Sequence, residues 1–245
     1  MKKAIIAILA FCAFSLVSAA PSAESILSAI DKNMTSQTTK STTRMVIHAK
    51  RSSRTVESVN YSQGSDRFFT EYLAPPRDKG TKMLKAGDNL WIYDPGTDRT
   101  IQISGNMLKQ SVMGSDLSYE DFMEEDKLSQ DYSAGVDGEI TYDGRACWIL
   151  TLMAKKPGLA YAKRKIYVDK SRYVVLYELL YAKSGKLLKS LKFSNVTKTG
   201  NRWYPRYILF KDELKDGKGT EYFVDSIQFD IPIPAATFTK ARLKK

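Results

Sequence analysis

Residues 73–123 read LAPPRDKGTKMLKAGDNLWIYDPGTDRTIQISGNMLKQSVMGSDLSYEDFM, and this stretch decides the fold class of the chain. Thr81–Ala86 and Leu90–Tyr93 flank a Gly-Asp-Asn turn, which predicts a β-hairpin, and Thr100–Ile103 predicts the next strand. At Ser104 the strand period is lost, and a methionine-rich stretch with helix-like spacing follows. A single amphipathic insert between strands can lie across the mouth of a curved sheet, and flexible thioethers suit irregular apolar partners such as acyl chains.

The insert carries two helix-start signals. Asn106 can cap a short helix that runs through Val112 and ends near Gly114, and Ser118 with Asp121 three residues later forms a capping box. The apolar side chains either fill a core or form a movable lid over a lipid-sized cavity, and the spacing alone fits both alternatives. These candidate lid residues are Met107, Leu108, Val112, Met113, Leu117, Phe122 and Met123.

Strands are predicted on both sides of the insert. Period-two alternation in Arg44–Lys50 places Met45 and Ile47 on one face and His48 on the other. After Tyr132, turn signals recur at hairpin spacing, which indicates an antiparallel meander. Tyr173–Tyr181 is apolar on both faces except at Glu178, so we expect a helix to cover this strand.

The predicted fold class is therefore α+β and mostly β, with about 11–13 antiparallel strands. So wide an open sheet tends to curl as strand twist accumulates, which leaves a concave side for helices to cover. One such helix is predicted after Ser22, with Ile26, Leu27, Ile30 and Met34 on one face. The basic tail Lys240–Lys245 is expected to be solvated.

The N-terminus has the pattern of an export signal. Lys2 and Lys3 precede the apolar run Ala4–Val17, and small residues then predict cleavage after Ala19. We expect residues 1–19 to be a signal peptide, residues 20–245 to form a single domain, and the location to be periplasmic. After cleavage Cys147 is the one remaining cysteine, so no internal disulfide is possible, and its apolar surroundings predict a buried side chain.

Charge is unevenly distributed along the chain. Residues 106–143 contain two lysines and ten acidic residues, a net charge of −8, whereas residues 155–245 contain 21 basic and eight acidic residues, a net charge of +13. This asymmetry indicates either opposed faces for different partners or simply a well-solvated surface. Export argues against nucleic acid as the natural ligand.

The sequence offers little for catalysis. His48 is the one histidine in the chain, and its place on the polar face of a strand favours a surface or hydrogen-bonded role. The nucleophile pattern Gly-x-Ser-x-Gly is absent, and one histidine with one cysteine cannot build an ordinary zinc site. The acids of residues 124–126 lie in a polar run typical of a solvated surface. We therefore expect no catalytic residues, no metal and no cofactor.

Five segments carry a resemblance to a known family: Asp78–Thr81, Met83–Lys85, Asn89–Tyr93, Ile103–Asp116 and Tyr119–Asp121. Together they resemble the LolA-like proteins, often called outer-membrane lipoprotein-sorting proteins. The resemblance implies an unclosed antiparallel β-barrel with helices over its opening. It also implies a periplasmic carrier that takes lipoproteins or another lipid cargo through an aqueous space. We expect an inner-membrane exporter, an outer-membrane acceptor or both as partners, transient membrane contact and a monomeric state.

The predicted function is non-enzymatic binding and delivery of acyl chains in a hydrophobic cavity gated by residues 104–123. The alternative is a periplasmic sensor, or an exporter-accessory module, of the same fold that binds a membrane protein. The candidate cavity wall is the hairpin set Met83, Leu84, Trp91 and Tyr93, although Leu90 and Ile92 on the opposite face of the same strand could line the cavity instead. Arg77 and Lys79 lie in the charged turn after the two prolines, which is either a solvated loop or a rim that meets the lid.

Overall fold

The computed structural model describes residues 20–48, 52–124 and 127–245. The predicted signal peptide, residues 1–19, lies outside the described residues, as do two members of the acidic run at 124–126 and the end of the strand predicted over residues 44–50. Within the described ranges, no helix has the length and apolar character needed to cross a bilayer.

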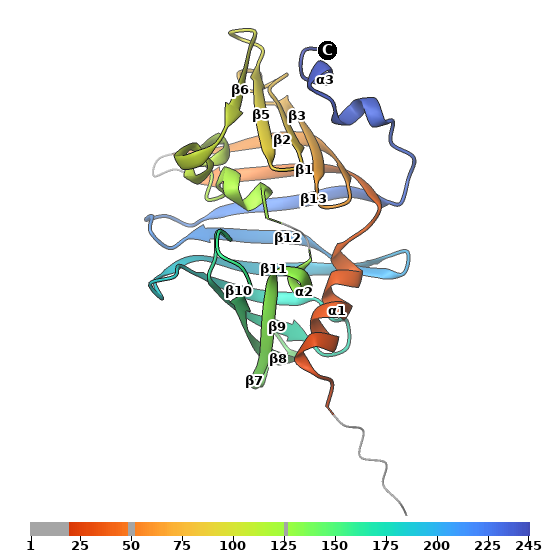
Figure 1. Cartoon of the computed structure of the whole chain (residues 1–245), viewed down its shortest axis with the longest axis vertical. Coiled ribbons are helices and arrows are strands. Elements are labelled where there is room, and N and C mark those ends of the chain that lie inside the picture. The colour runs from red at the N-terminus through yellow and green to blue at the C-terminus, as the bar shows by residue number, and fades with distance from the viewer. Residues whose placement is uncertain (1–19, 49–51, 125–126) are drawn as a thin grey trace, which may run out of the picture.

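In the part of the chain that the structure describes, thirteen strands form one antiparallel sheet in the order β6-β5-β4-β3-β2-β1-β13-β12-β11-β10-β9-β8-β7, which confirms the predicted mostly-β, unclosed architecture. The strands are β1 (Thr38–His48), β2 (Ser53–Gln63), β3 (Arg67–Ala74), β4 (Lys82–Ala86), β5 (Asn89–Asp94), β6 (Arg99–Ile103), β7 (Tyr132–Tyr142), β8 (Arg145–Ala154), β9 (Lys163–Asp169), β10 (Val175–Tyr181), β11 (Leu187–Thr199), β12 (Arg202–Asp212) and β13 (Thr220–Phe229). β6 and β7 are the free edges, and they lie towards opposite ends of the molecule (Figure 1).

Helix α1 (Ala23–Met34) begins where the sequence predicts. The Ser22 side chain accepts a hydrogen bond from the Ser25 backbone N–H at 3.2 Å, which satisfies one free donor of the first turn. Its apolar side packs with β7–β9 in a buried cluster that includes Leu27, Trp148 and Leu150. The short helix α2 (Leu128–Asp131) lies beside it, so one half of the sheet is covered by helix (Figure 1).

The prediction that residues 173–181 are buried on both faces is wrong. In β10, Leu176, Glu178 and Leu180 are buried, whereas the alternate residues are only partly covered. Tyr177 packs instead against Tyr142 and Tyr167, with every ring centroid 5.5 Å from the others. Neighbouring tyrosines shield one another on the outer side of the sheet, so no covering helix is needed there.

The methionine-rich insert is not α-helical. It forms three 3₁₀ turns, η1 (Gly105–Lys109), η2 (Val112–Gly114) and η3 (Tyr119–Phe122), and Asn106 does not cap the first of them. Met113 has φ of 52° and Gly114 has φ of 71°, so the backbone leaves the right-handed helical region between the turns. The capping box of Ser118 and Asp121 is present as predicted.

Lys240, Lys244 and Lys245 of the basic tail are exposed, as predicted, but Leu243 is buried, so the tail is also packed against the sheet. Residues 235–245 contain η4 (Ala235–Phe238) and α3 (Lys240–Leu243), which lie against β3 and β4. Phe238 and Leu243 are buried with Phe69 and Leu84, and the Lys240 ammonium lies 4.3 Å from the Trp91 ring centroid. The tail thus covers an apolar patch on the outer side of the sheet.

Two single-residue predictions are confirmed. Cys147 is fully buried. The His48 ring is hydrogen-bonded through Nε2 to Glu221 at 2.7 Å and through Nδ1 to Ser53 at 2.8 Å.

Asp169 fixes the turn between β9 and β10. Its carboxylate is buried and accepts hydrogen bonds from Arg145 Nε at 2.8 Å, from Arg172 Nε at 2.7 Å and from the Ser171 backbone N–H at 2.9 Å. Burial by itself would raise the pKa of Asp169, but hydrogen bonds from Arg145, Ser171 and Arg172 outweigh it and hold the pKa well below its ordinary value.

Asp169→Asn is expected to lower the free energy of unfolding at pH 7 by about 2 kcal/mol or more, because the charge-assisted hydrogen bonds weaken. A carboxylate with a depressed pKa stabilises the fold above its unfolded pKa of about 3.9, and this contribution is lost as the pH falls through the folded value. The gap in melting temperature between native and variant proteins should therefore shrink below about pH 4. Asp143→Asn, in an exposed turn, is the control; a gap that stays constant down to pH 3 would contradict the assignment.

Candidate functional site

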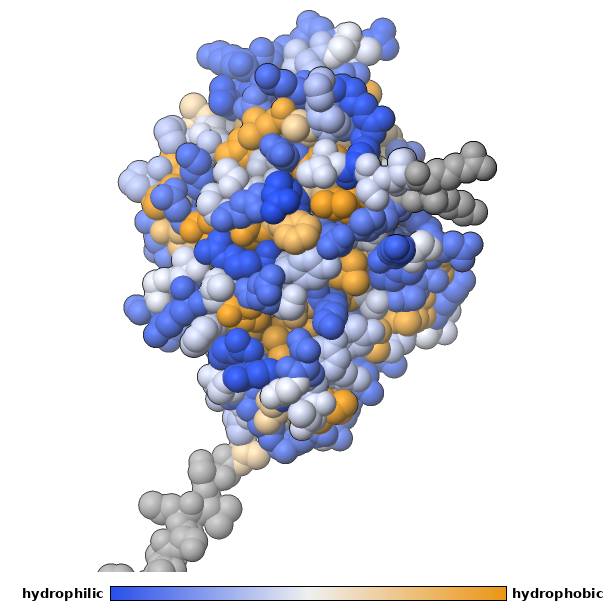
Figure 2. Space-filling model, turned by 180° about the vertical axis from the view of Figure 1, so that it is seen from behind, coloured by the Kyte–Doolittle hydropathy of each residue, from blue (hydrophilic) through white to orange (hydrophobic). Residues whose placement is uncertain are grey.

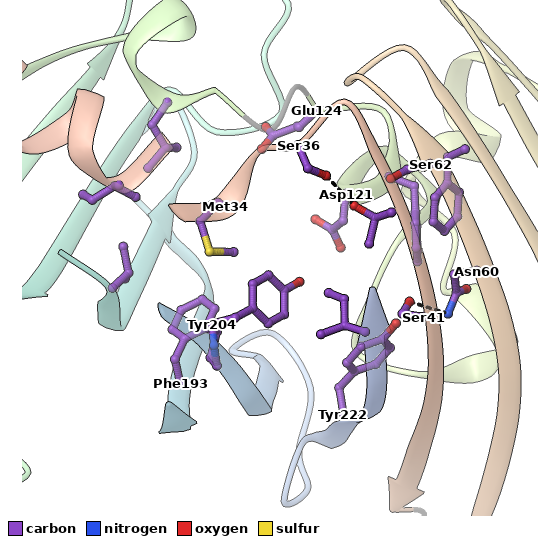
Figure 3. A pocket seen from close by; sticks show the side chains of 18 of the residues that line it. Met34, Ser36, Ser41, Asn60, Ser62, Asp121, Glu124, Phe193, Tyr204 and Tyr222 are labelled. Carbon is purple, nitrogen blue, oxygen red and sulfur yellow. Dashed lines mark hydrogen bonds between the residues drawn. The ribbon is translucent and has the colours of Figure 1, made fainter. Parts of the chain in front are cut away.

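The concave side of the sheet holds a cavity of about 400 Å³. Its walls come from α1, from β1–β3 and β9–β13, and from residues 121–124 at the end of the insert. Figure 3 shows Met34, Asp121, Tyr204 and Tyr222 around the same open space. Strands β2 and β10 both line it although four strands separate them in the sheet. The sheet must therefore bend around the cavity.

The walls are mixed in character. Apolar side chains come from α1 and the central strands and include Ile30, Phe193 and Ile227. Opposite them, Ser41 and Asn60 present polar atoms, and Asn60 belongs to a buried hydrogen-bond network on β1–β3. In that network Asn60 Nδ2 donates to Thr43 at 3.0 Å and Thr70 donates to Asn60 Oδ1 at 2.8 Å. Because these groups satisfy one another, this wall is stable without a ligand.

The insert is held against the sheet by charged groups at its C-terminal end. Lys189 Nζ on β11 donates to Asp121 Oδ2 at 2.5 Å and to Ser118 Oγ at 2.8 Å, and Tyr161 donates to Asp121 Oδ1 at 2.5 Å. Burial and the adjacent Asp121 carboxylate raise the pKa of the Tyr161 phenol, which therefore stays protonated as a donor. Arg164 on β9 pairs with Glu124.

Among the described residues, four ion pairs join the acidic stretch 106–143 to the basic stretch 155–245. Lys156 pairs with Asp131, Arg164 with Glu124, Lys170 with Glu139 and Lys189 with Asp121. Part of the charge asymmetry is therefore neutralised by pairing, with the Arg164–Glu124 and Lys189–Asp121 pairs largely buried and the other two partly exposed.

Comparison with known proteins agrees with this architecture. A family model described as "-like: Uncharacterized protein" matches residues 64–245. A DUF1329 family protein from Desulfovibrio piger is 26% identical, with a TM-score of 0.81 over 90% of this chain and 97% of that one. The LolA superfamily protein from Nitrosomonas europaea is 21% identical, with a TM-score of 0.76 over 91% of this chain and 100% of that one. This chain belongs to the family of that model and has the LolA-like fold.

A further solved relative has the same fold. The domain described as an outer membrane lipoprotein-sorting protein domain from Vibrio parahaemolyticus is 22% identical to this LolA-like protein, with a TM-score of 0.77 over 89% of this chain and 97% of that one. No curated protein matches the chain in sequence.

The candidate lid residues of the LolA-like protein do not all meet the cavity. Phe122 lines it. Val112 and Leu117 are buried against Met45 and Tyr72 on the concave side of β1–β3, and Met113 packs partly on the same cluster. Met107, Leu108 and Met123 pack against Met83 and Leu90 nearer the β6 edge. The insert thus fills one half of the concave side and reaches the cavity with its last residues; its role as a lid remains a prediction.

The four candidate wall residues do not line the cavity. Met83 faces the concave side, but it is covered by the insert. Leu84, Trp91 and Tyr93 face the outer side, where Leu84 and Trp91 lie opposite each other in the β4–β5 pairing and the C-terminal tail covers them. Alternate residues of a strand point to opposite faces, so the sequence could not tell which pair faces inward.

The charged turn after the prolines reaches the insert through different residues from those predicted. Arg77 is 64% exposed and Lys79 is also exposed. Asp78 instead binds Arg54 Nη1 at 2.8 Å, and the other terminal nitrogen of Arg54 donates to the Met113 carbonyl oxygen. The turn and β2 therefore hold the middle of the insert.

Three residues that contact the insert, Arg54, Arg164 and Lys189, were not predicted from the sequence. Each is a charged residue within a strand, and the positions of Arg164 and Lys189 face the concave side. The one visible signal was Glu178, the single charge in an otherwise apolar strand, which pairs with Arg164 at 2.9 Å.

A second groove, of about 960 Å³, lies outside the insert. It runs between residues 109–120 and the turns that follow β8, β10 and β12. Its lining is rich in lysine, with Lys109, Lys155, Lys183 and Lys215 among its residues. On the face of the molecule seen in Figure 2, apolar residues form small patches separated by hydrophilic ones, so this face offers no continuous apolar surface.

Proposed function

We propose that this LolA-like protein is a non-enzymatic periplasmic carrier of lipid, with residues 20–245 as one domain after removal of the predicted signal peptide. The observation that carries the proposal is the 400 Å³ cavity on the concave side, bordered by the end of the insert. Ligand pockets typically measure about 300–1,000 Å³. The cavity is therefore large enough for one ligand of modest size.

An acyl chain fits the energetics of such a site. Each buried methylene contributes about 0.8 kcal/mol, so ten methylenes supply roughly 8 kcal/mol before the losses of binding are subtracted. Release is then the harder step. Short 3₁₀ turns and side-chain links hold the insert, and these can rearrange more readily than a continuous helix, so we assign residues 104–123 the role of a lid.

The cargo would be the acyl chain of a lipoprotein or another lipid. Transfer would begin at an inner-membrane exporter and end at an outer-membrane acceptor, with transient contact at each membrane. The protein would act as a monomer.

Ile227→Trp is expected to weaken lipid binding at least tenfold. Ile227 lies on β13, is 8% exposed and lines the cavity, so an indole ring at this position would occupy the space. The measurement is displacement of a fluorescent fatty-acid probe by unlabelled lipid. Ile140→Trp on the edge strand β7, where the side chain is 37% exposed, is the matched control and should bind as the native protein does. If both variants bind lipid equally, the cavity is not the lipid-binding site.

A second measurement addresses the alternative function. The protein is purified from an exporting host and extracted for mass spectrometry, and we expect a co-purifying lipid. If no lipid is found and the probe does not bind, the carrier proposal fails and a partner-binding sensor or exporter-accessory module becomes the better account.

A further inference from the structure

The outer groove, which lies between the insert and the turns after β8, β10 and β12, has an apolar floor. Apolar side chains from several segments line it, among them Leu117, Leu159, Ala162, Leu188 and Leu214. Ligand pockets are mostly apolar and measure about 300–1,000 Å³. At about 960 Å³, the groove therefore has the size and the lining of a binding site.

One wall of the groove is basic. It is built from residues 153–162, which lead from β8 to β9, and from residues 182–188, which lead from β10 to β11. Backbone hydrogen bonds of 3.0 Å from Ala154 to Ala162 and from Ala162 to Tyr181 hold these segments together. The two segments contain four lysines and no acidic residue, and we call them the lysine wall.

Two charges of the lysine wall have no carboxylate partner among the described residues. Lys155 Nζ donates to the Ser129 carbonyl oxygen at 2.8 Å, and this acceptor is neutral. Lys183 is exposed and makes no ion pair within the described ranges. Lys156, by contrast, pairs with Asp131. Both Lys155 and Lys183 line the groove, so their ammonium groups are available to a phosphate or another anion.

The acidic residues that line the groove lie on other segments, the insert and the end of β12. Asp212 pairs with Lys215 at 3.0 Å, and Asp116 accepts a hydrogen bond from Thr220 Oγ1 at 2.6 Å. Glu120 has no such partner, and burial and the adjacent carboxylate of the insert raise its pKa. The negative end of a ligand would therefore lie at the lysine wall rather than at the insert.

The groove and the cavity lie on two sides of one polar cluster. Asp121 lines the cavity. Ser118, Tyr161 and Lys189 line the groove, and all three donate hydrogen bonds to that carboxylate. A ligand in the groove would therefore lie next to the residues that hold the insert against the sheet.

We propose that the outer groove is a second lipid site, which binds a single-chain lipid with an anionic headgroup. The headgroup lies at Lys155 and Lys183, and the hydrocarbon chain lies on the apolar floor. A groove with positive charge on one wall and an apolar floor matches a ligand with one charged end, whereas an acidic peptide carries its charges along its length. The proposal extends the carrier function proposed above to a different site, so either can fail alone.

The first test compares dodecyl phosphate with dodecylphosphocholine, which has the same chain and phosphate but also carries a cation. Binding to Ile227→Trp, whose cavity is filled, is measured by calorimetry at pH 7.5 and below micelle-forming concentrations. We expect dodecyl phosphate to bind more tightly by about fivefold or more. Equal affinities, or binding by the native protein alone, would overturn the groove proposal and leave the carrier proposal in place. If the groove preference holds but Ile227→Trp binds the fatty-acid probe as the native protein does, the cavity proposal fails alone.

Variants locate the headgroup. Lys155→Met combined with Lys183→Met should abolish the preference for dodecyl phosphate, and a preference that survives would overturn the assignment. Lys192→Met combined with Lys198→Met, at exposed positions of β11, removes the same charge and should keep the preference. Glu120→Gln should tighten dodecyl phosphate by about twofold, because a competing carboxylate is removed. All five side chains are at least partly exposed, so these variants test the proposal even where the cavity variant does not fold.

Competition separates a lipid from other anions. Inorganic phosphate and an acetylated octapeptide of alternating leucine and glutamate are each added at the concentration of dodecyl phosphate. Neither should displace the lipid. Displacement by inorganic phosphate would show that charge alone is recognised, and displacement by the peptide would show a docking surface for an acidic protein segment. Either result would overturn the lipid assignment.

Discussion

Deletion of residues 235–245 is expected to lower the free energy of unfolding by about 5 kcal/mol. The tail contributes two buried apolar side chains, Phe238 and Leu243, and loss of one large core side chain typically costs about 3–5 kcal/mol. The deletion also uncovers Phe69, Leu84 and Trp91 on the outer side of the sheet. Exposed apolar surface of this kind promotes association, so the truncated protein should also aggregate.

Chemical denaturation measures the effect on stability, and light scattering measures association. Phe238→Ala alone should cost about 3 kcal/mol, near the lower limit for such a truncation. Removal of only residues 244–245 is the control, because both are exposed. If the eleven-residue deletion unfolds at the native denaturant concentration, the tail does not stabilise the fold.

Lys189→Met is expected to cost about 3 kcal/mol and to loosen the insert. Lys189 is 9% exposed and donates to both Asp121 and Ser118, so the substitution leaves a largely buried carboxylate without its cation. The backbone amides of residues 118–123 should then exchange with solvent faster than in the native protein, while the amides of β8 and β9 should not. Hydrogen exchange followed by mass spectrometry resolves the two regions.

Lys192→Met is the matched control, since it lies on the same strand but on the exposed outer side. It should change stability by less than about 0.5 kcal/mol. Adding Asp121→Asn to Lys189→Met should recover part of the loss, because the unpaired charge is then gone. Uniformly faster exchange across the sheet would show that Lys189 supports the whole fold rather than the insert.

The strands could be predicted from sequence because their signals are local. Period-two patterns and turn residues predicted the meander, the hairpin of β4 and β5, and the mostly-β class, whereas the unclosed barrel was implied by the resemblance. Which face of a strand points inward is not a local property. Met83 and Leu84 are neighbours in sequence and are both fully buried, yet one lies under the insert and the other under the C-terminal tail.

In the insert, too, the feature that depends on neighbouring residues could be predicted and the path of the backbone could not. The capping box at Ser118 depends on residues three apart and was predicted correctly. The helix predicted after Asn106 was wrong, because the backbone turns at Met113 and Gly114 into a conformation that helical spacing cannot reveal.

The candidate site was the least predictable part. Lys189 and Asp121 are 68 residues apart, and Arg164 and Glu124 are 40 apart, so the ion pairs that shape the cavity wall leave no local pattern. Each residue alone resembles an ordinary surface charge. Only the bend of the sheet brings them together.

Because the sheet has two free edges, the strand pairing does not fix the width of its interior. In a closed barrel the strand number and stagger fix the diameter, because every strand is bonded on both sides. Here β6 and β7 never meet, so the sheet has no fixed circumference. A change in twist about the central strands β11–β13 would spread the two halves apart without breaking any hydrogen bond between strands. The limit on widening of the interior is therefore set by the insert, which Arg54 ties to β2 and which Arg164 and Lys189 tie to β9 and β11.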